Sequence, residues 1–224
     1  MIKFFKAVII GAPASGKGTI SSRIINYFDV KHVSSGDILR SNMSMNTDLG
    51  LKVKQYVNKG HLVPDELMIS LISNELGLLK NNNWILDGFP RTKEQAEELF
   101  TKEPIYVALN LIVPFEIIVE RVKGRWIHER SGRVYNTEYS PPKVTGKDDV
   151  TGEDLIQRPD DQPEAVMKRL EIYSESINPI LDFYRKKGIL KDFRGKTSNE
   201  IWPLVYNFLK NYMTPKAEFN QQIN

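Results

Sequence analysis

The chain contains no cysteine, and this absence excludes disulfides, thiolate metal sites and a cysteine nucleophile. It also contains no apolar run that approaches the ~18 residues of a membrane-spanning helix. The formal net charge is only +3, which is too small to indicate bulk binding to nucleic acid. Hydrophobic residues make up 41% and charged residues 26% of the 224 positions, as is typical of one compact globular enzyme. We therefore expect neither nucleic acid nor a membrane as a partner.

A glycine-rich segment, residues 11–19, directly follows the apolar run 7–10 and reads Gly-Ala-Pro-Ala-Ser-Gly-Lys-Gly-Thr. A strand that turns through glycines into a helix points several backbone N–H groups at one place, where the helix N-terminus adds partial positive charge. The spacing matches the phosphate-binding P-loop with Lys17 as its lysine, although Gly18 precedes Thr19 where a Ser or Thr is usual. The alternative is a glycine-rich turn with a surface lysine, and the strand–loop–helix context argues against it. The segment predicts a site for nucleotide phosphates.

Strand and helix patterns alternate along the chain. Strands are predicted over residues 6–10, 32–34, 84–86, 105–113 and 189–193. Helices are predicted over residues 17–28, within 38–80, and over 92–102, 114–123, 163–187 and 198–212. The alternation predicts an α/β P-loop NTPase fold, a five-stranded parallel sheet flanked by helices. Two inserts, one helical and one polar without a sustained period, leave from the sheet edge where ligands bind in such folds.

A second motif follows the third predicted strand, where Asp87 begins the run Asp-Gly-Phe-Pro-Arg that ends at Arg91. An acidic residue at the end of a buried strand in a P-loop fold holds a metal ion or its water shell. The planar guanidinium of Arg91 can bind two phosphate oxygens at once. The alternative is a turn at Asp-Gly followed by a surface arginine. Further arginines stand at loop edges and helix starts, and they favour a phosphate-binding cleft: Arg40, Arg125, Arg158 and Arg169.

More motifs complete the pattern: residues 34–37 with Arg40, 60–63, 87–91 with Gln95, Arg121 with Arg125, 131–135, 148–152 and 158–161. With these, the chain resembles the adenylate kinase (nucleoside monophosphate kinase) family over nearly its whole length, in its long-lid form. Within the family, residues 125–128, 155–158 and 199–203 look like the mitochondrial GTP:AMP phosphotransferase branch. The resemblance implies reversible in-line transfer of a γ-phosphoryl group, with GTP favoured, to AMP with Mg²⁺. It also implies a monomer in the mitochondrial matrix.

The resemblance further implies a division of the chain and a role for individual residues. The core would be residues 1–34, 64–124 and 163–213, with a monophosphate-binding insert at 35–63, a lid at 125–162 and a flexible tail at 214–224. The implied catalytic residues are Lys17, Arg91, Arg125, Arg158 and Arg169. The implied donor-binding residues are Ala14, Ser15, Gly16, Lys17, Gly18, Thr19, Arg125, Val134, Tyr135 and Thr197. The implied AMP-binding residues are Ser35, Arg40, His61, Leu62, Val63, Gly88, Arg91, Gln95, Arg158 and Arg169. Mg²⁺ is expected near Thr19 and Asp87.

Three features depart from patterns common in the family. Ala14 and Ser35 stand where Gly and Thr are frequent, and alanine restricts any position that needs a positive φ. Some family lids also hold zinc through Cys and Asp, and the matching places here are His128, Ser131, Asp148 and Thr151. We expect these four to form a hydrogen-bonded staple in place of zinc. The alternative is that they are unrelated surface residues.

Other functions fit parts of the sequence. An ATP:AMP adenylate kinase is the alternative within the family, and a UMP/CMP kinase is similar but has a short lid. A regulatory GTPase needs Asn-Lys-x-Asp to read guanine, and residues 58–61 lack the final Asp. A nucleotide sensor without catalysis would be expected to lose some of the cations named above, and none is lost. A cytoplasmic location is the alternative to the mitochondrial matrix.

Overall fold

The computed structural model describes residues 4–157 and 161–216. Its centre is a five-stranded sheet with the strand order β2-β3-β1-β4-β7, and every neighbouring pair is parallel. The strands are β1 (Lys6–Gly11), β2 (Lys31–Ser34), β3 (Trp84–Asp87), β4 (Val107–Ile112) and β7 (Leu190–Arg194). β1 and β3 are almost wholly buried, as expected of parallel strands covered on both faces. The predicted five-stranded parallel sheet is confirmed.

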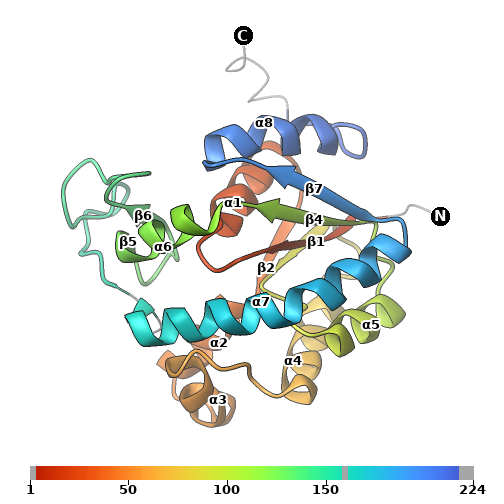
Figure 1. Cartoon of the computed structure of the whole chain (residues 1–224), viewed down its shortest axis with the longest axis horizontal. Coiled ribbons are helices and arrows are strands. Elements are labelled where there is room, and N and C mark those ends of the chain that lie inside the picture. Colours follow the sequence, from red (N-terminus) through yellow and green to blue (C-terminus); the bar gives the residue numbers. More distant parts are fainter. Residues whose placement is uncertain (1–3, 158–160, 217–224) are drawn as a thin grey trace.

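Side chains of β1 alternate between two cores, one on each face of the sheet. Ala7 and Ile9 pack against one group of helices, whereas Val8 and Ile10 pack against another. The first face is covered by α1 (Lys17–Tyr27), α6 (Phe115–Lys123) and α8 (Ser198–Leu209). The second face is covered by α4 (Asp65–Gly77), α5 (Lys93–Lys102) and α7 (Pro163–Lys186). In Figure 1, α1 and α8 lie on one side of the sheet and α7 and α5 on the other.

Two helices, α2 (Ser35–Ser44) and α3 (Asp48–Asn58), separate β2 from α4 and pack on each other. Both begin at hydroxyl caps, because Ser34 Oγ accepts from the N–H of Asp37 at 3.2 Å and Thr47 Oγ1 accepts from the N–H of Gly50 at 3.1 Å. In Figure 1 this pair lies beyond the N-terminal half of α7, away from the sheet. α2 and α3 fill the predicted helical insert.

The polar insert contains a short antiparallel hairpin, β5 (Arg125–Ile127) with β6 (Val134–Asn136), that pairs Trp126 with Tyr135. The sequence pattern did not indicate these strands, because three residues are too few for an alternation to stand out. An added bridge joins Ile127 to Ile156. Figure 1 shows the hairpin at the left, next to α6 and away from the sheet.

The last described part of the chain consists of α8 and the first residues of the tail. α8 ends at Leu209 rather than at residue 212, and of the predicted flexible tail residues 214–216 are described. There the N–H of Lys216 donates to the carbonyl of Tyr27 at 2.8 Å, and its ammonium donates to the carbonyl of Ile25 at 2.7 Å. The remainder of that tail lies outside the described residues. No helix within residues 4–157 and 161–216 is both long and apolar enough to cross a membrane.

Candidate functional site

The glycine-rich loop joins β1 to α1 and takes left-handed backbone conformations at Ala14 and Gly16. Gly16 has φ +91° and is the N-cap of α1, which carries no side-chain cap. Ala14 takes φ +59°, so the position that the sequence marked as restrictive does adopt the left-handed region, at a strain of about 1–3 kcal/mol. Lys17 folds back over the loop and donates to the carbonyls of Gly11 and Ala12 at 2.8 and 3.0 Å. An uncapped helix N-terminus beside an ammonium group is a ready site for phosphate.

Positive charge is concentrated around this loop. Burial lowers the pKa of Lys17 to about 8, Asp87 opposes that shift, and the guanidinium groups of Arg91, Arg169 and Arg125 add to it. Four cations that repel one another in one cleft are stabilised when a polyanion enters. The predicted catalytic cations Lys17, Arg91, Arg125 and Arg169 are therefore near neighbours, whereas Arg158 lies outside the described residues.

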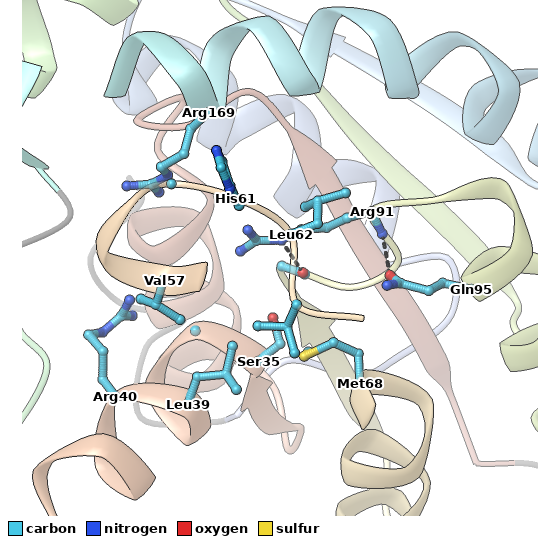
Figure 2. Close-up of a pocket in the computed structure, with 14 residues that line it drawn as sticks. Ser35, Leu39, Arg40, Val57, His61, Leu62, Met68, Arg91, Gln95 and Arg169 are labelled. Carbon is cyan, nitrogen blue, oxygen red and sulfur yellow. Dashed lines mark hydrogen bonds between the residues drawn. The ribbon is translucent and has the colours of Figure 1, made fainter. Parts of the chain in front are cut away.

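A cavity of about 50 Å³ lies among α2, α7, the segment 57–63 and the loop after β3 (Figure 2). Arg169 enters it from α7, Arg40 from α2, and Arg91 from the loop after β3. Every predicted AMP-binding residue that the structure describes lines this cavity: Ser35, Arg40, His61, Leu62, Val63, Gly88, Arg91, Gln95 and Arg169. The sequence did not single out three further apolar residues of the lining, Leu39, Val57 and Met68, because apolar residues on helices indicate a core.

Two glycines allow the segments of this cavity to approach. Gly88 has φ +80°, and a Cβ there would lie 2.6 Å from Ser35 Oγ. Gly60 has φ +72°, and a Cβ there would lie 2.4 Å from the carbonyl oxygen of Ala165, so the chain after α3 touches the backbone of α7. The carbonyl of Gly88 also accepts from Arg91 Nε at 2.7 Å, which sets the direction of the guanidinium.

A second cavity, of about 80 Å³, lies between the loop and α7. Pro13 and Lys17 line it from the loop, and Ile177 and Ile180 line it from α7. The two cavities share the following residues: Gly60, Leu62, Gly88, Arg91 and Arg169. The phosphate loop and the pocket described above therefore adjoin across a common wall that contains two arginines.

A buried carboxylate that sequence reasoning did not assign holds two of the cations. Asp161 Oδ2 accepts from Arg125 Nε at 2.7 Å, its other oxygen pairs with Arg125 Nη2, and Arg169 Nη1 lies 3.6 Å from Oδ1. The Asp161 side chain is only 4% exposed. It stands in the motif at residues 158–161, but no local pattern indicated which cations it would meet.

The residues expected to contact the base of the donor nucleotide lie on β6 and at the start of α8. Tyr135 is buried and donates its hydroxyl to Asp148, while Val134 is exposed on β6. Thr197 caps α8 by accepting from the N–H of Glu200 at 3.1 Å. Arg121, which sequence reasoning noted only in a motif, links the loop to this region, because it donates to the carbonyls of Ala14 at 3.3 Å and of Lys196 at 2.8 Å. A donor-base role for Val134, Tyr135 and Thr197 stays a prediction.

The residues expected near Mg²⁺ suit an ion that takes few of its ligands from protein side chains. Asp87 ends β3, is 9% exposed, and lies 3.8 Å through Oδ2 from His32 Nε2. Thr19 is exposed on the first turn of α1. The part of the chain that the structure describes contains no cluster of three or more His, Cys, Asp or Glu that could hold a metal. Mg²⁺ bound with phosphates uses only one or two carboxylates, so a single buried Asp87 fits it.

Comparison with known proteins decides the family. The model of the family described as "ADK: Adenylate kinase" matches residues 9–189. The chain belongs to the adenylate kinase family. The chain is 51% identical over 209 residues to "GTP:AMP phosphotransferase, mitochondrial" of Drosophila melanogaster, covering 93% of this chain and 97% of that protein. A yeast (Saccharomyces cerevisiae) protein of the same name is 42% identical over 221 residues, which cover 93% of this chain and 94% of the yeast protein. "Adenylate kinase" of Shouchella clausii (strain KSM-K16) is 41% identical over 216 residues, which cover 93% of this chain and 98% of that protein.

The four residues expected to form a hydrogen-bonded staple in place of zinc lie together. His128 Nδ1 is 2.7 Å from Ser131 Oγ, Thr151 Oγ1 donates to Asp148 Oδ2 at 2.9 Å, and Thr151 Oγ1 lies 3.4 Å from His128 Nε2. His128 and Asp148 are buried. Hydrogen-bond contacts therefore join the four residues, and their role in place of zinc stays a prediction.

The structure adds three residues to that network. Arg133 donates to both oxygens of Asp148 at 2.8 and 2.6 Å, Tyr135 donates to Oδ1 at 2.8 Å, and Glu153 Oε2 lies 2.6 Å from His128 Nε2. The bonds from Arg133, against the opposing effect of desolvation, hold the pKa of Asp148 well below its usual range. Sequence reasoning had placed Arg133 and Tyr135 in a family motif, and their convergence on one carboxylate had no local signal.

Proposed function

We propose that this protein transfers the γ-phosphoryl group of GTP to AMP, reversibly and with Mg²⁺ on the triphosphate. The observation that carries the proposal is the wall of Arg91 and Arg169 between the cavity at the glycine-rich loop and the cavity lined by the residues expected to bind AMP. In-line transfer requires two polyanions side by side, with cations where their charges meet. Two adjoining cavities that share guanidinium groups meet this requirement.

No general base is needed for this reaction. The second pKa of a monophosphate is near ~6, so the attacking oxygen is already ionised at neutral pH. What remains is to position both nucleotides and to stabilise charge that spreads over the transferred group. Lys17 and the loop N–H groups would bind the donor phosphates, Arg40 and Arg91 the acceptor phosphate, and Arg91 would also contact the transferred group. Asp161 would keep Arg125 and Arg169 in place.

Two further parts complete the proposed mechanism. Mg²⁺ held through Asp87, with Thr19 near, would neutralise charge on the β- and γ-phosphates. Water competes with AMP as the nucleophile, so we infer that the lid, residues 125–162, closes over the cleft before transfer. Arg125 at the base of the lid, together with Arg158, would then meet the phosphates.

The preference for GTP rests on chemistry and on the relatives. Guanine offers N1–H and N2–H₂ as neighbouring donors, whereas adenine offers one donor group and one acceptor on that edge. A hydrogen-bond acceptor, the Glu200 carboxylate, lies beside the loop at residues 196–199. It accepts from the N–H of Lys196 at 2.9 Å and from Thr197 Oγ1 at 3.1 Å. The Drosophila and yeast relatives are named GTP:AMP phosphotransferases. The alternative, an ATP:AMP adenylate kinase, is supported by the name of the Shouchella relative.

Competition between the donors tests this preference. With equal GTP and ATP and limiting AMP, we expect GTP to be consumed roughly ten- to a hundredfold faster, since one unpaired polar edge on ATP costs ~1–3 kcal/mol. Chromatography of the four di- and triphosphates gives both rates in one reaction. Equal consumption, or an excess for ATP, would make the protein an ATP:AMP adenylate kinase.

We also propose a mitochondrial location and action as a monomer on free nucleotides. The names of the Drosophila and yeast relatives support the location. Imaging of the tagged full chain tests it, and a purely cytoplasmic signal would contradict it. Sedimentation equilibrium tests the monomer, and a mass twice that of the 25.8 kDa chain would contradict it.

A further inference from the structure

A carboxylate stands behind the AMP pocket and is absent from its lining. Asp65, the first residue of α4, accepts from Gln95 Nε2 through Oδ1 at 2.7 Å and from Thr92 Oγ1 through Oδ2 at 2.8 Å. Thr92 is itself the N-cap of α5 and accepts from the N–H of Gln95 at 3.1 Å. Asp65 therefore ties the start of α4 to the start of α5 at the residue expected to read the base.

The Gln95 amide is bound at both of its ends. Gln95 is only 2% exposed, and its Oε1 accepts from the backbone N–H of Arg91 at 2.7 Å, as the dashed line in Figure 2 marks. A primary amide has two N–H donors and an oxygen with two lone pairs. After these bonds, one N–H and one lone pair are left for a ligand in the cavity that Gln95 lines.

The backbone N–H of Arg91 and the Asp65 carboxylate also fix the orientation of the Gln95 amide. A backbone N–H only donates and a carboxylate only accepts, so Oε1 must face Arg91 and Nε2 must face Asp65. A half-turn of the amide would place two donors against each other at Arg91 and two acceptors against each other at Asp65. Both bonds would be lost, and one of them is to a charged group.

A fixed amide distinguishes purines by the groups at positions 6 and 1. Adenine has an N6 donor and an N1 acceptor, which pair with Oε1 and Nε2 of glutamine. Hypoxanthine has the opposite pattern, with an O6 acceptor and an N1 donor, and it pairs only with the turned amide. Discrimination between the two bases therefore depends on how hard the amide is to turn.

We propose that Asp65 is a positioning residue that sets the base selectivity of the acceptor site by locking the Gln95 amide. The proposal rests on the function proposed above, with AMP as the acceptor. It adds the determinant that makes the site select a 6-amino purine over a 6-oxo purine. Asp65 does this without touching the nucleotide, through the bond between Oδ1 and Nε2.

Asp65→Asn is the direct test, because asparagine has the same shape but can present either a donor or an acceptor to Gln95. We expect the ratio of kcat/KM for AMP to that for IMP to fall at least tenfold, with kcat for AMP within twofold of the unmodified protein. Asp65→Glu, which keeps an acceptor-only group, should retain most of the ratio. Glu66→Gln is the matched control, since it removes one exposed negative charge from the same helix turn and should leave the ratio unchanged.

The Gln95→Ala background separates positioning from general support of the pocket. There the AMP-to-IMP ratio should be low already, and Asp65→Asn should not change it further. Where Asp65→Asn does not fold, as judged by circular dichroism, Asp65→Ser replaces it, because a hydroxyl also donates or accepts. An unchanged ratio in the folded variant, or equal losses with AMP and IMP, overturns the proposal. Failure of the unmodified protein to form ADP from AMP would instead overturn the proposed function.

Discussion

Tyr135→Phe removes one oxygen atom from the hydrogen-bonded network of the lid and leaves the ring in place. The hydroxyl donates to Asp148 Oδ1 at 2.8 Å and accepts from the N–H of Asp149 at 2.9 Å. Tyr135 is 7% and Asp148 only 2% exposed, so water has little access to the Asp148 oxygen that the substitution leaves behind, whereas Asp149 is exposed. The perturbation is therefore two hydrogen bonds at one atom, with no change of charge.

The expected magnitude follows from the two hydrogen bonds that are lost. Each contributes about 0.5–1.5 kcal/mol, which makes about 1–3 kcal/mol for the pair. Because ~1.4 kcal/mol is a tenfold change in an equilibrium, local opening of the lid should become about 5- to 150-fold more frequent. The sheet shares no part of this network, so its opening should be unaffected.

Hydrogen exchange measures this opening amide by amide. The N–H of Thr151, bound to Asp148 Oδ2 at 2.8 Å, and that of Gly132, bound to the carbonyl of His128 at 2.9 Å, should exchange faster by that factor. Amides of β1 should keep their rates. Tyr139→Phe is the control, since its hydroxyl bonds Glu120 in an exposed position at 2.9 Å and its loss should change little. Unchanged lid exchange in Tyr135→Phe, or equal acceleration in β1, would refute the network as a local staple.

Three other predictions follow from the cleft and its close contacts. Arg91→Ala should lower kcat by at least ~100-fold with a native circular dichroism spectrum, as for the loss of one charge-stabilising donor, and a fall below tenfold in the folded variant would contradict its role. A pKa of about 8 for Lys17 means that its ammonium is charged below pH 8 and neutral above it, so kcat/KM for the donor should fall above pH 8. A flat profile to pH 10 would be inconsistent with that pKa. Gly60→Ala should lower the thermal midpoint, because its Cβ meets the carbonyl of Ala165 at 2.4 Å with φ at +72°, and an unchanged Tm would rule out that contact.

The parts of the fold that the sequence predicted are those with a local cause. The phosphate loop is a contiguous segment, and the buried strands are short apolar runs between turn residues, so pattern and composition suffice. The hairpin of β5 and β6 was missed because its strands owe their pairing to partners across the turn. The end of α8 was placed three residues late, because its aromatic residues continue beyond the last helical turn.

The residues of the site also divide into those that a local sequence motif indicates and those that it does not. Single arginines could be named because each stands in a motif, and the cavity then gathers the described members. Asp161, Asp65 and Glu153 could not be assigned, because an acidic residue has a role only through the partner that the fold brings to it. Leu39 and Met68 are apolar wall residues that look the same in sequence as any core position.

Transfer of a labelled phosphoryl group tests the central claim most directly. The protein is mixed with GTP labelled at the γ-phosphate, Mg²⁺ and AMP, and the products are separated at early times. The account predicts that the label appears in the β-phosphate of ADP, in step with loss of AMP and release of unlabelled GDP. Label that appears as inorganic phosphate whether or not AMP is present would identify a GTPase, and label that stays in GTP would identify a binding protein; either result would contradict the account.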